Sequence, residues 1–194
     1  RARHQETGRS GRVGSLAGGF TAGYGTREWR GQEAVRTEGR VWVLCVGLAL
    51  AHLLLHVGLA IGRAAPDLLT VALLLGAREM GMGRAAGLGL FFGLLEDALG
   101  VLSFGANSVA MTVVGALGAV TRDLFVGDSL FFLVSYFVIG KWTRDLVHWV
   151  MVGESLRAPF AEQVVVQGLM GGLYAALVGV LLLGITGIGK RAQV

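Results

Sequence analysis

Two groups of charged side chains interrupt the apolar stretches of this 194-residue chain. The first is the adjacent pair Glu96 and Asp97, which lies in the run 93–108, GLLEDALGVLSFGANS. The second has the spacing i, i+3, i+4, i+7, which places all its members on one helical face: Lys141, Arg144, Asp145 and His148. A charge at the centre of an apolar span costs about 2.5–3.5 kcal/mol on insertion scales, so it normally has a partner. We therefore expect an interhelical pair between Asp97 and Lys141 or Arg144.

This predicted polar cluster is compatible with three kinds of chemistry. The ion pairs can simply lock the helices together, because removing one partner of a buried pair typically costs about 3–5 kcal/mol; alternatively, the basic side chains extend to the membrane interface. A polar path can carry a proton or a solute through the bundle. The third option is a site that recognises a partner subunit. The sequence leaves these options open for Glu96, Asp97, Lys141, Arg144, Asp145 and His148.

Two histidines, His52 and His56, lie one helical turn apart in the first apolar segment. Imidazole is a common axial ligand of haem, and the same pair suits a chlorophyll-type pigment; the alternative is hydrogen bonding between helices. The single cysteine, Cys45, and the absence of zinc-type spacing predict no metal site. We predict no cofactor. No phosphate-binding loop, nucleophile elbow or HExxH motif occurs, so none of the common catalytic signatures is present.

The composition indicates an all-α integral membrane protein. The chain is 54% hydrophobic and 15% charged, with 32 glycines, whereas a soluble domain carries about 25% charged residues. The net charge of +4 is small, and most basic residues flank apolar segments, which membrane topology explains. We therefore expect no binding to nucleic acid.

The expected organisation is a basic polar tail, residues 1–40, followed by a transmembrane domain, residues 41–194. The tail has eight arginines and four glutamates without an apolar segment, so it is not a signal peptide and would be disordered alone. An ordered tail would imply a stable complex. Six spans are expected in one glycine-rich bundle, and the second is short enough to be tilted or re-entrant: Val41–Ile61, Leu68–Ala77, Ala85–Leu102, Ser108–Val120, Leu130–Trp149 and Val164–Ile188.

The distribution of basic residues predicts the orientation of these spans. In the six-span arrangement, 13 of the 17 lysines and arginines fall on the side of the two termini and two on the other side. The positive-inside rule then places both termini in the cytoplasm. The arginines of the tail could also bind anionic membrane lipids, at about 1 kcal/mol per basic residue.

Glycines recur at the small-xxx-small spacing that allows helix backbones to approach closely. Packing within the bundle is one interpretation, and a face for a partner helix is the other. The pairs are Gly83 and Gly87, Gly89 and Gly93, and Gly168 and Gly172.

The order of these features resembles the bacterial rod-shape-determining MreD family. The resemblance covers roughly 41–188 and is carried by PDLLTVALLLGAR at 66–78 and GLLEDALGVLSFGANSVAMTVVGALG at 93–118, with TRDLVHW and VVVQGLMGGLYAALVGVLLL further on. The acidic position of the family pattern falls on Asp97, and the start of its next helix falls on 105–109. Asp145 resembles a second intramembrane acidic position. The 40-residue basic tail and the extra charge of Glu96 depart from the pattern.

The resemblance implies that the protein is not an enzyme but a non-catalytic scaffold of the cell-elongation and peptidoglycan machinery in the bacterial cytoplasmic membrane. Its fold would be similar to that of the substrate-binding S-components of vitamin transporters. Its partners would be an MreC-type scaffold, a SEDS glycosyltransferase and a class B transpeptidase, with MreB filaments on the cytoplasmic side. Two other functions fit the same sequence: an accessory structural subunit of a respiratory or photosynthetic complex, and a solute-binding transporter component.

Overall fold

The computed structural model describes residues 39–55, 67–100, 104–121 and 129–186, and every regular element in these ranges is a helix. The prediction of an all-α protein is therefore confirmed for the described residues. The chain divides into two units, Arg1–Glu38 and Gly39–Val194, and everything below concerns the second. The polar tail up to residue 38, and His56, lie outside the described residues. The long helices are Gly39–Leu53, α2 (Leu68–Glu79), α3 (Met82–Leu99), α4 (Ala106–Thr121), α5 (Leu130–Met151) and α6 (Gly168–Thr186).

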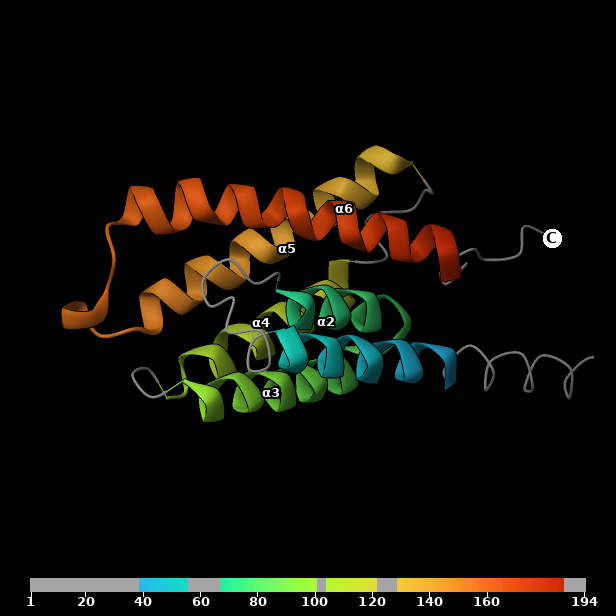
Figure 1. Ribbon diagram of the computed structural model, residues 1–194, viewed down its shortest axis with the longest axis horizontal. Helices are drawn as coiled ribbons and strands as arrows, with labels where there is room; N and C mark the ends of the chain where they lie inside the picture. The colour runs from blue at the N-terminus through green and yellow to red at the C-terminus, as the bar shows by residue number, and fades with distance from the viewer. Residues whose placement is uncertain (1–38, 56–66, 101–103, 122–128, 187–194) are drawn as a thin grey trace, which may run out of the picture. The chain divides into compact units, whose positions relative to one another are not determined.

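Helix α2 is the core of the bundle. Its residues 68–77 are all buried, as expected for a helix that is apolar on every side. It contacts α3, α4, α5 and α6, and Figure 1 shows it between α3 and the pair of α5 and α6. At 12 residues it measures about 18 Å, so it is too short to cross a bilayer core of about 30 Å.

Helices α3 and α4 form the closest pair because two glycines of α3 bring the backbones into contact. A Cβ built on Gly93 would lie 2.4 Å from the Ser108 Cα atom, and one on Gly89 would lie 2.2 Å from the Met111 carbonyl oxygen. These distances are too short for any side chain, so hydrogen is the only substituent that permits this approach.

A second hairpin pairs α5 with α6 (Figure 1). Gly172 of α6 lies against the backbone of Val138. The connection between the two helices is held by Trp149, whose Nε1 donates to the Ala158 carbonyl oxygen at 2.9 Å and whose ring lies 4.5 Å from the Arg157 guanidinium carbon. This hairpin carries the basic residues of the site.

One continuous helix among the described residues, Ala161–Thr186, is long and apolar enough to cross a membrane. Its first seven residues are π-helical and lead directly into α6. Its most apolar window has a mean hydropathy of 2.1, yet only 33% of that window is buried inside the chain. A helix that is apolar all round and left uncovered is stable in an apolar medium or against another protein.

The other described helices are shorter or more charged than the six-span prediction assumed. The described part of the first predicted span, Gly39–Leu53, and α4 are shorter than a span, and α2 is a core helix. Residues 56–61 of that first predicted span lie outside the described residues. Helices α3 and α5 are long enough, but each carries three or more charged residues. The structure therefore supports one clear membrane-crossing helix among the described residues, and a complete six-span bundle remains a prediction.

The glycine pairs divide into two groups. Gly89, Gly93, Gly168 and Gly172 contact neighbouring helices. A Cβ on Gly83 or Gly87 would meet no atom within 4 Å among the described residues. For this pair, packing within the described bundle is therefore wrong, because that face of α3 points outward.

We predict opposite effects for two Gly→Ala substitutions on α3. Gly93→Ala forces α3 and α4 apart and should cost about 1–3 kcal/mol of stability through overpacking. Gly87→Ala meets open space and should be neutral or stabilise the helix by up to about 1 kcal/mol. Thermal unfolding followed by circular dichroism in detergent measures both. Equal stability of the two variants would contradict the close contact at Gly93.

Candidate functional site

Asp97 links the end of α3 to the start of α4. Its side chain is 2% exposed and accepts four hydrogen bonds. Three come from the backbone N–H groups of Gly105 at 2.9 Å, Asn107 at 3.2 Å and Ser108 at 3.0 Å, and the fourth comes from the Ser108 hydroxyl at 2.5 Å. The first N–H groups of a helix have no partner within that helix, and a carboxylate is a favoured group at this position. Gly105 has a φ of 95°, a conformation that glycine adopts without strain.

Arg144 and Lys141 of α5 lie at the centre of an ion network with Asp67, Glu96 and Asp145. The Arg144 guanidinium donates to Glu96 at 2.6 Å and to Asp145 at 3.2 Å, and it lies 3.7 Å from Asp67. The Lys141 ammonium lies 2.5 Å from Asp145 and 3.4 Å from Asp67. All five side chains are at most 16% exposed. The network thus joins α5 to α3 and to the N-terminus of α2.

The predicted pairing of Asp97 with Lys141 or Arg144 is wrong in its choice of carboxylate. Glu96 pairs with Arg144, whereas Asp97 is fully occupied by the start of α4. Adjacent residues on a helix point about 100° apart, so only one of the two carboxylates can face α5. The MreD pattern does not require a charge at Glu96, yet Glu96 is the residue that pairs with Arg144.

Three residues that the sequence analysis did not assign to the site belong to it. Asp67 caps α2, because its carboxylate accepts from the Thr70 N–H at 3.0 Å and the Thr70 hydroxyl at 2.7 Å. The spacing Asp-x-x-Thr before an apolar run is a recognisable helix start, which could have identified it. Asn107 accepts from Arg144 at 3.0 Å, and Ser108 donates to Asp97. Neither has a sequence signature of its own.

The histidines lie at the edges of this network. His148 is partly buried, and its Nδ1 atom, like the Nε atom of Arg144, has no hydrogen-bond partner among the described residues. His52 is 3% exposed and lines a polar cavity of about 170 Å³ with Glu96, Leu99, Gly100 and Asn107. The structure therefore brings His52 to the predicted polar cluster, through Glu96.

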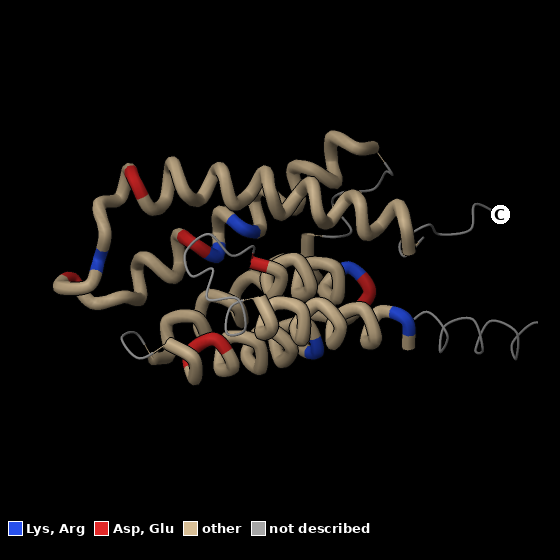
Figure 2. The backbone as a smooth tube through the Cα atoms, in the orientation of Figure 1, with Lys and Arg blue, Asp and Glu red and all other residues tan. Residues whose placement is uncertain are grey.

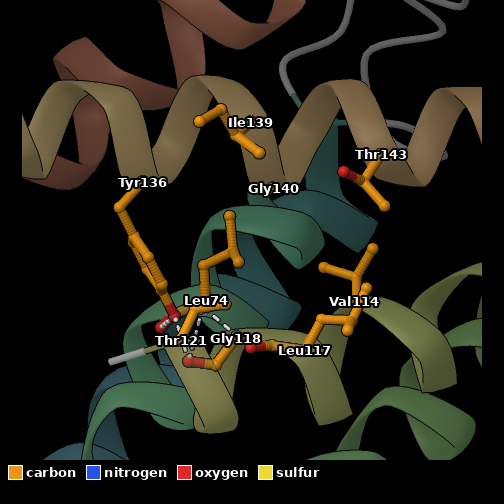
Figure 3. Close-up of a pocket in the computed structure, with 9 residues that line it drawn as sticks. All are labelled: Leu74, Val114, Leu117, Gly118, Thr121, Tyr136, Ile139, Gly140 and Thr143. Carbon is orange, nitrogen blue, oxygen red and sulfur yellow. Dashed lines mark hydrogen bonds between the residues drawn. The ribbon is translucent and has the colours of Figure 1, made fainter. Parts of the chain in front are cut away.

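An apolar cavity of about 130 Å³ lies between α2, α4 and α5. Figure 3 shows its lining, in which the Tyr136 hydroxyl donates to the carbonyl oxygens of Leu74 at 2.9 Å and Gly118 at 3.3 Å. Leu74, Val114, Leu117 and Ile139 supply most of the rest of its wall. The polar side chains among its described lining residues are those of Tyr136, Thr121 and Thr143, each with a hydroxyl group.

The chemistry of the site is ionic and hydrogen-bonding. Figure 2 shows acidic and basic positions adjoining each other within α5, between long stretches of helix without charge. No group of three His, Cys, Asp or Glu side chains in the described ranges could hold a metal ion. Each cation of the network is already paired with carboxylates, an arrangement that holds helices together.

Comparison of the chain with protein-family models, with curated proteins and with solved structures gives no match. The assignment of function therefore depends on the site and the sequence pattern.

We predict that Asp97→Ala destabilises the protein by about 3 kcal/mol or more, because it leaves buried N–H donors without an acceptor. Ser108→Ala removes a single donor and should cost about 1 kcal/mol. Chemical unfolding of both variants in detergent tests this order. Equal losses for the two variants would show that the backbone donors do not depend on Asp97.

We also predict strong coupling between Glu96 and Arg144. Arg144→Met leaves buried carboxylates without their cation and should cost about 3–5 kcal/mol, whereas the additional change Glu96→Gln should cost little more. A double-mutant cycle of unfolding free energies measures this coupling. Additive costs would mean that the pair contributes no interaction energy.

Proposed function

We propose that this chain is a non-catalytic membrane scaffold of the MreD type, which helps to assemble the cell-elongation and peptidoglycan machinery. The observation that carries the proposal is the role of Asp97, the acidic position on which the resemblance centres. Its carboxylate fastens the α3–α4 turn from within the bundle. This role is structural, which suits a protein that presents surfaces to partners.

The proposal of a multi-pass membrane domain is supported by the apolar surface of the helices. Large apolar side chains are exposed along several of them, among them Phe91 on α3, Phe131 on α5 and Leu177 on α6, which are 61%, 74% and 60% exposed. The charged groups of the ion network, in contrast, are paired inside the bundle. An apolar exterior with a compensated polar interior is the arrangement that a bilayer requires.

The proposed placement of both ends of the domain on the cytoplasmic side is supported by one long-range contact. The Arg40 guanidinium donates to the Thr186 carbonyl oxygen at 2.6 Å. The start of the Gly39–Leu53 helix and the end of α6 are therefore at the same end of the bundle. With the bias of basic residues toward that side, the positive-inside rule favours the cytoplasm.

A scaffold role needs surfaces for other membrane helices. The exposed face of α6 includes Leu169, Leu173, Leu177 and Leu181, at the i, i+4 spacing of one continuous stripe. Its partners in this proposal are an MreC-type scaffold and, through it, the SEDS glycosyltransferase and the class B transpeptidase. Lipid covers the faces that no partner occupies.

The test is purification of the tagged full chain from its native membrane in mild detergent, with mass spectrometry and an absorption spectrum of the same sample. We expect recovery of an MreC-type protein and cell-wall synthases, and weaker recovery with Asp97→Ala than with Glu162→Gln, a change at an exposed carboxylate outside the ion network. Recovery of respiratory or photosynthetic subunits, or pigment absorbance, would overturn the proposal and support an accessory subunit. Full partner recovery and normal cell shape with Asp97→Ala would also contradict it.

A further inference from the structure

The ion network holds more negative than positive charge. Among the described residues, the three carboxylates of Asp67, Glu96 and Asp145 face two cations, Lys141 and Arg144. His148 makes no ion pair with these carboxylates among the described contacts. A net negative charge in a poorly solvated interior is costly unless a cation compensates it.

The polar cavity beside Glu96 is the place where such a cation fits. One of its walls is the C-terminus of α3, at Leu99 and Gly100. The last carbonyl groups of a helix lack helical partners and carry a partial negative charge, and the last turn of α3 contains no basic residue to offset it. The helix end and the Glu96 carboxylate therefore both favour positive charge in the cavity.

The size and lining of the cavity favour an organic ammonium over a bare metal ion. Its volume is about 170 Å³, and a protein cavity of about 150 Å³ can hold a molecule as large as benzene. A primary ammonium has three N–H donors, and the Glu96 carboxylate and the carbonyls at the end of α3 provide acceptors. Leu99 offers an apolar wall for the attached carbons.

We propose that the cavity lined by His52, Glu96, Leu99, Gly100 and Asn107 binds a small primary ammonium group, R–NH₃⁺. This group comes from a free amine or from the ethanolamine headgroup of a lipid. The proposal goes beyond the scaffold function and does not depend on it, since the scaffold is tested by partner recovery and this site by ligand binding.

The test uses the full chain in detergent at constant ionic strength, with thermal unfolding as the readout. Ethylammonium should raise the unfolding temperature in a saturable manner, because a ligand that binds only the folded state stabilises it. Tetramethylammonium, which has no N–H donor, and potassium should give no such rise. No effect of ethylammonium, or equal effects of all three cations, would overturn the proposal.

Three variants localise the effect. Glu96→Gln should weaken the apparent affinity for ethylammonium at least tenfold. Leu99→Trp fills the cavity and keeps every charge of the network, so it should abolish the rise in unfolding temperature. It also tests whether ethylammonium binds in this cavity if Glu96→Gln fails to fold. The matched control is Glu162→Gln, an exposed carboxylate outside the cavity, which should bind like the unaltered chain. An unchanged shift in Leu99→Trp, or its loss in Glu162→Gln, would refute this site.

Nanodiscs identify the source of the amine once binding is established. If the headgroup occupies the cavity, the chain should be more stable in phosphatidylethanolamine than in phosphatidylcholine, and ethylammonium should add little in the former. Equal stability in the two lipids, with the full ethylammonium effect in both, would assign the site to a free amine.

Discussion

Arg144 is the residue on which the arrangement of the helices depends. Its guanidinium contacts Glu96 of α3, Asn107 of α4 and Asp145 of its own helix, and it lies within 3.7 Å of Asp67 at the start of α2. The planar guanidinium has five donors in a fixed geometry, which no other side chain supplies. A single cation therefore sets the relative positions of four helices. In an apolar medium the cost of separating it from its carboxylates enforces that geometry.

Close backbone packing complements this ionic centre. Gly93 lies against Ser108 and Asn107, so two of the three residues that bind Asp97 also lie at a point of close approach between α3 and α4. A larger residue at Gly93 would move the donors away from the carboxylate. The hydrogen bonds and the glycine contact are therefore one constraint, since each is possible only if the other is kept.

The sequence predicted the kinds of elements better than it predicted their partners. Apolar runs identified the helices, and the i, i+3, i+4, i+7 spacing correctly placed Lys141, Arg144 and Asp145 on a common face, where they form ion pairs. The choice between Glu96 and Asp97 depends on the rotation of α3 about its axis, which local sequence does not determine. The same rotation places Gly89 against α4 and leaves Gly87 without a neighbour among the described residues. Asn107 belongs to the network because it lies at the start of α4, within hydrogen-bond distance of Arg144 on α5.

The length of α2 explains why the cluster exists at all. This helix of about 18 Å is surrounded by longer ones, so its N-terminus ends within the bundle, where the preceding Asp67 is only 16% exposed. The unpaired N–H groups of a helix start need an acceptor, and Asp67 provides one through Thr70. Its carboxylate then needs cations, which Lys141 and Arg144 supply from α5. Those two cations attract Glu96 and Asp145 in turn, so the ion network among the described residues follows from a core helix whose first residue lies inside the bundle.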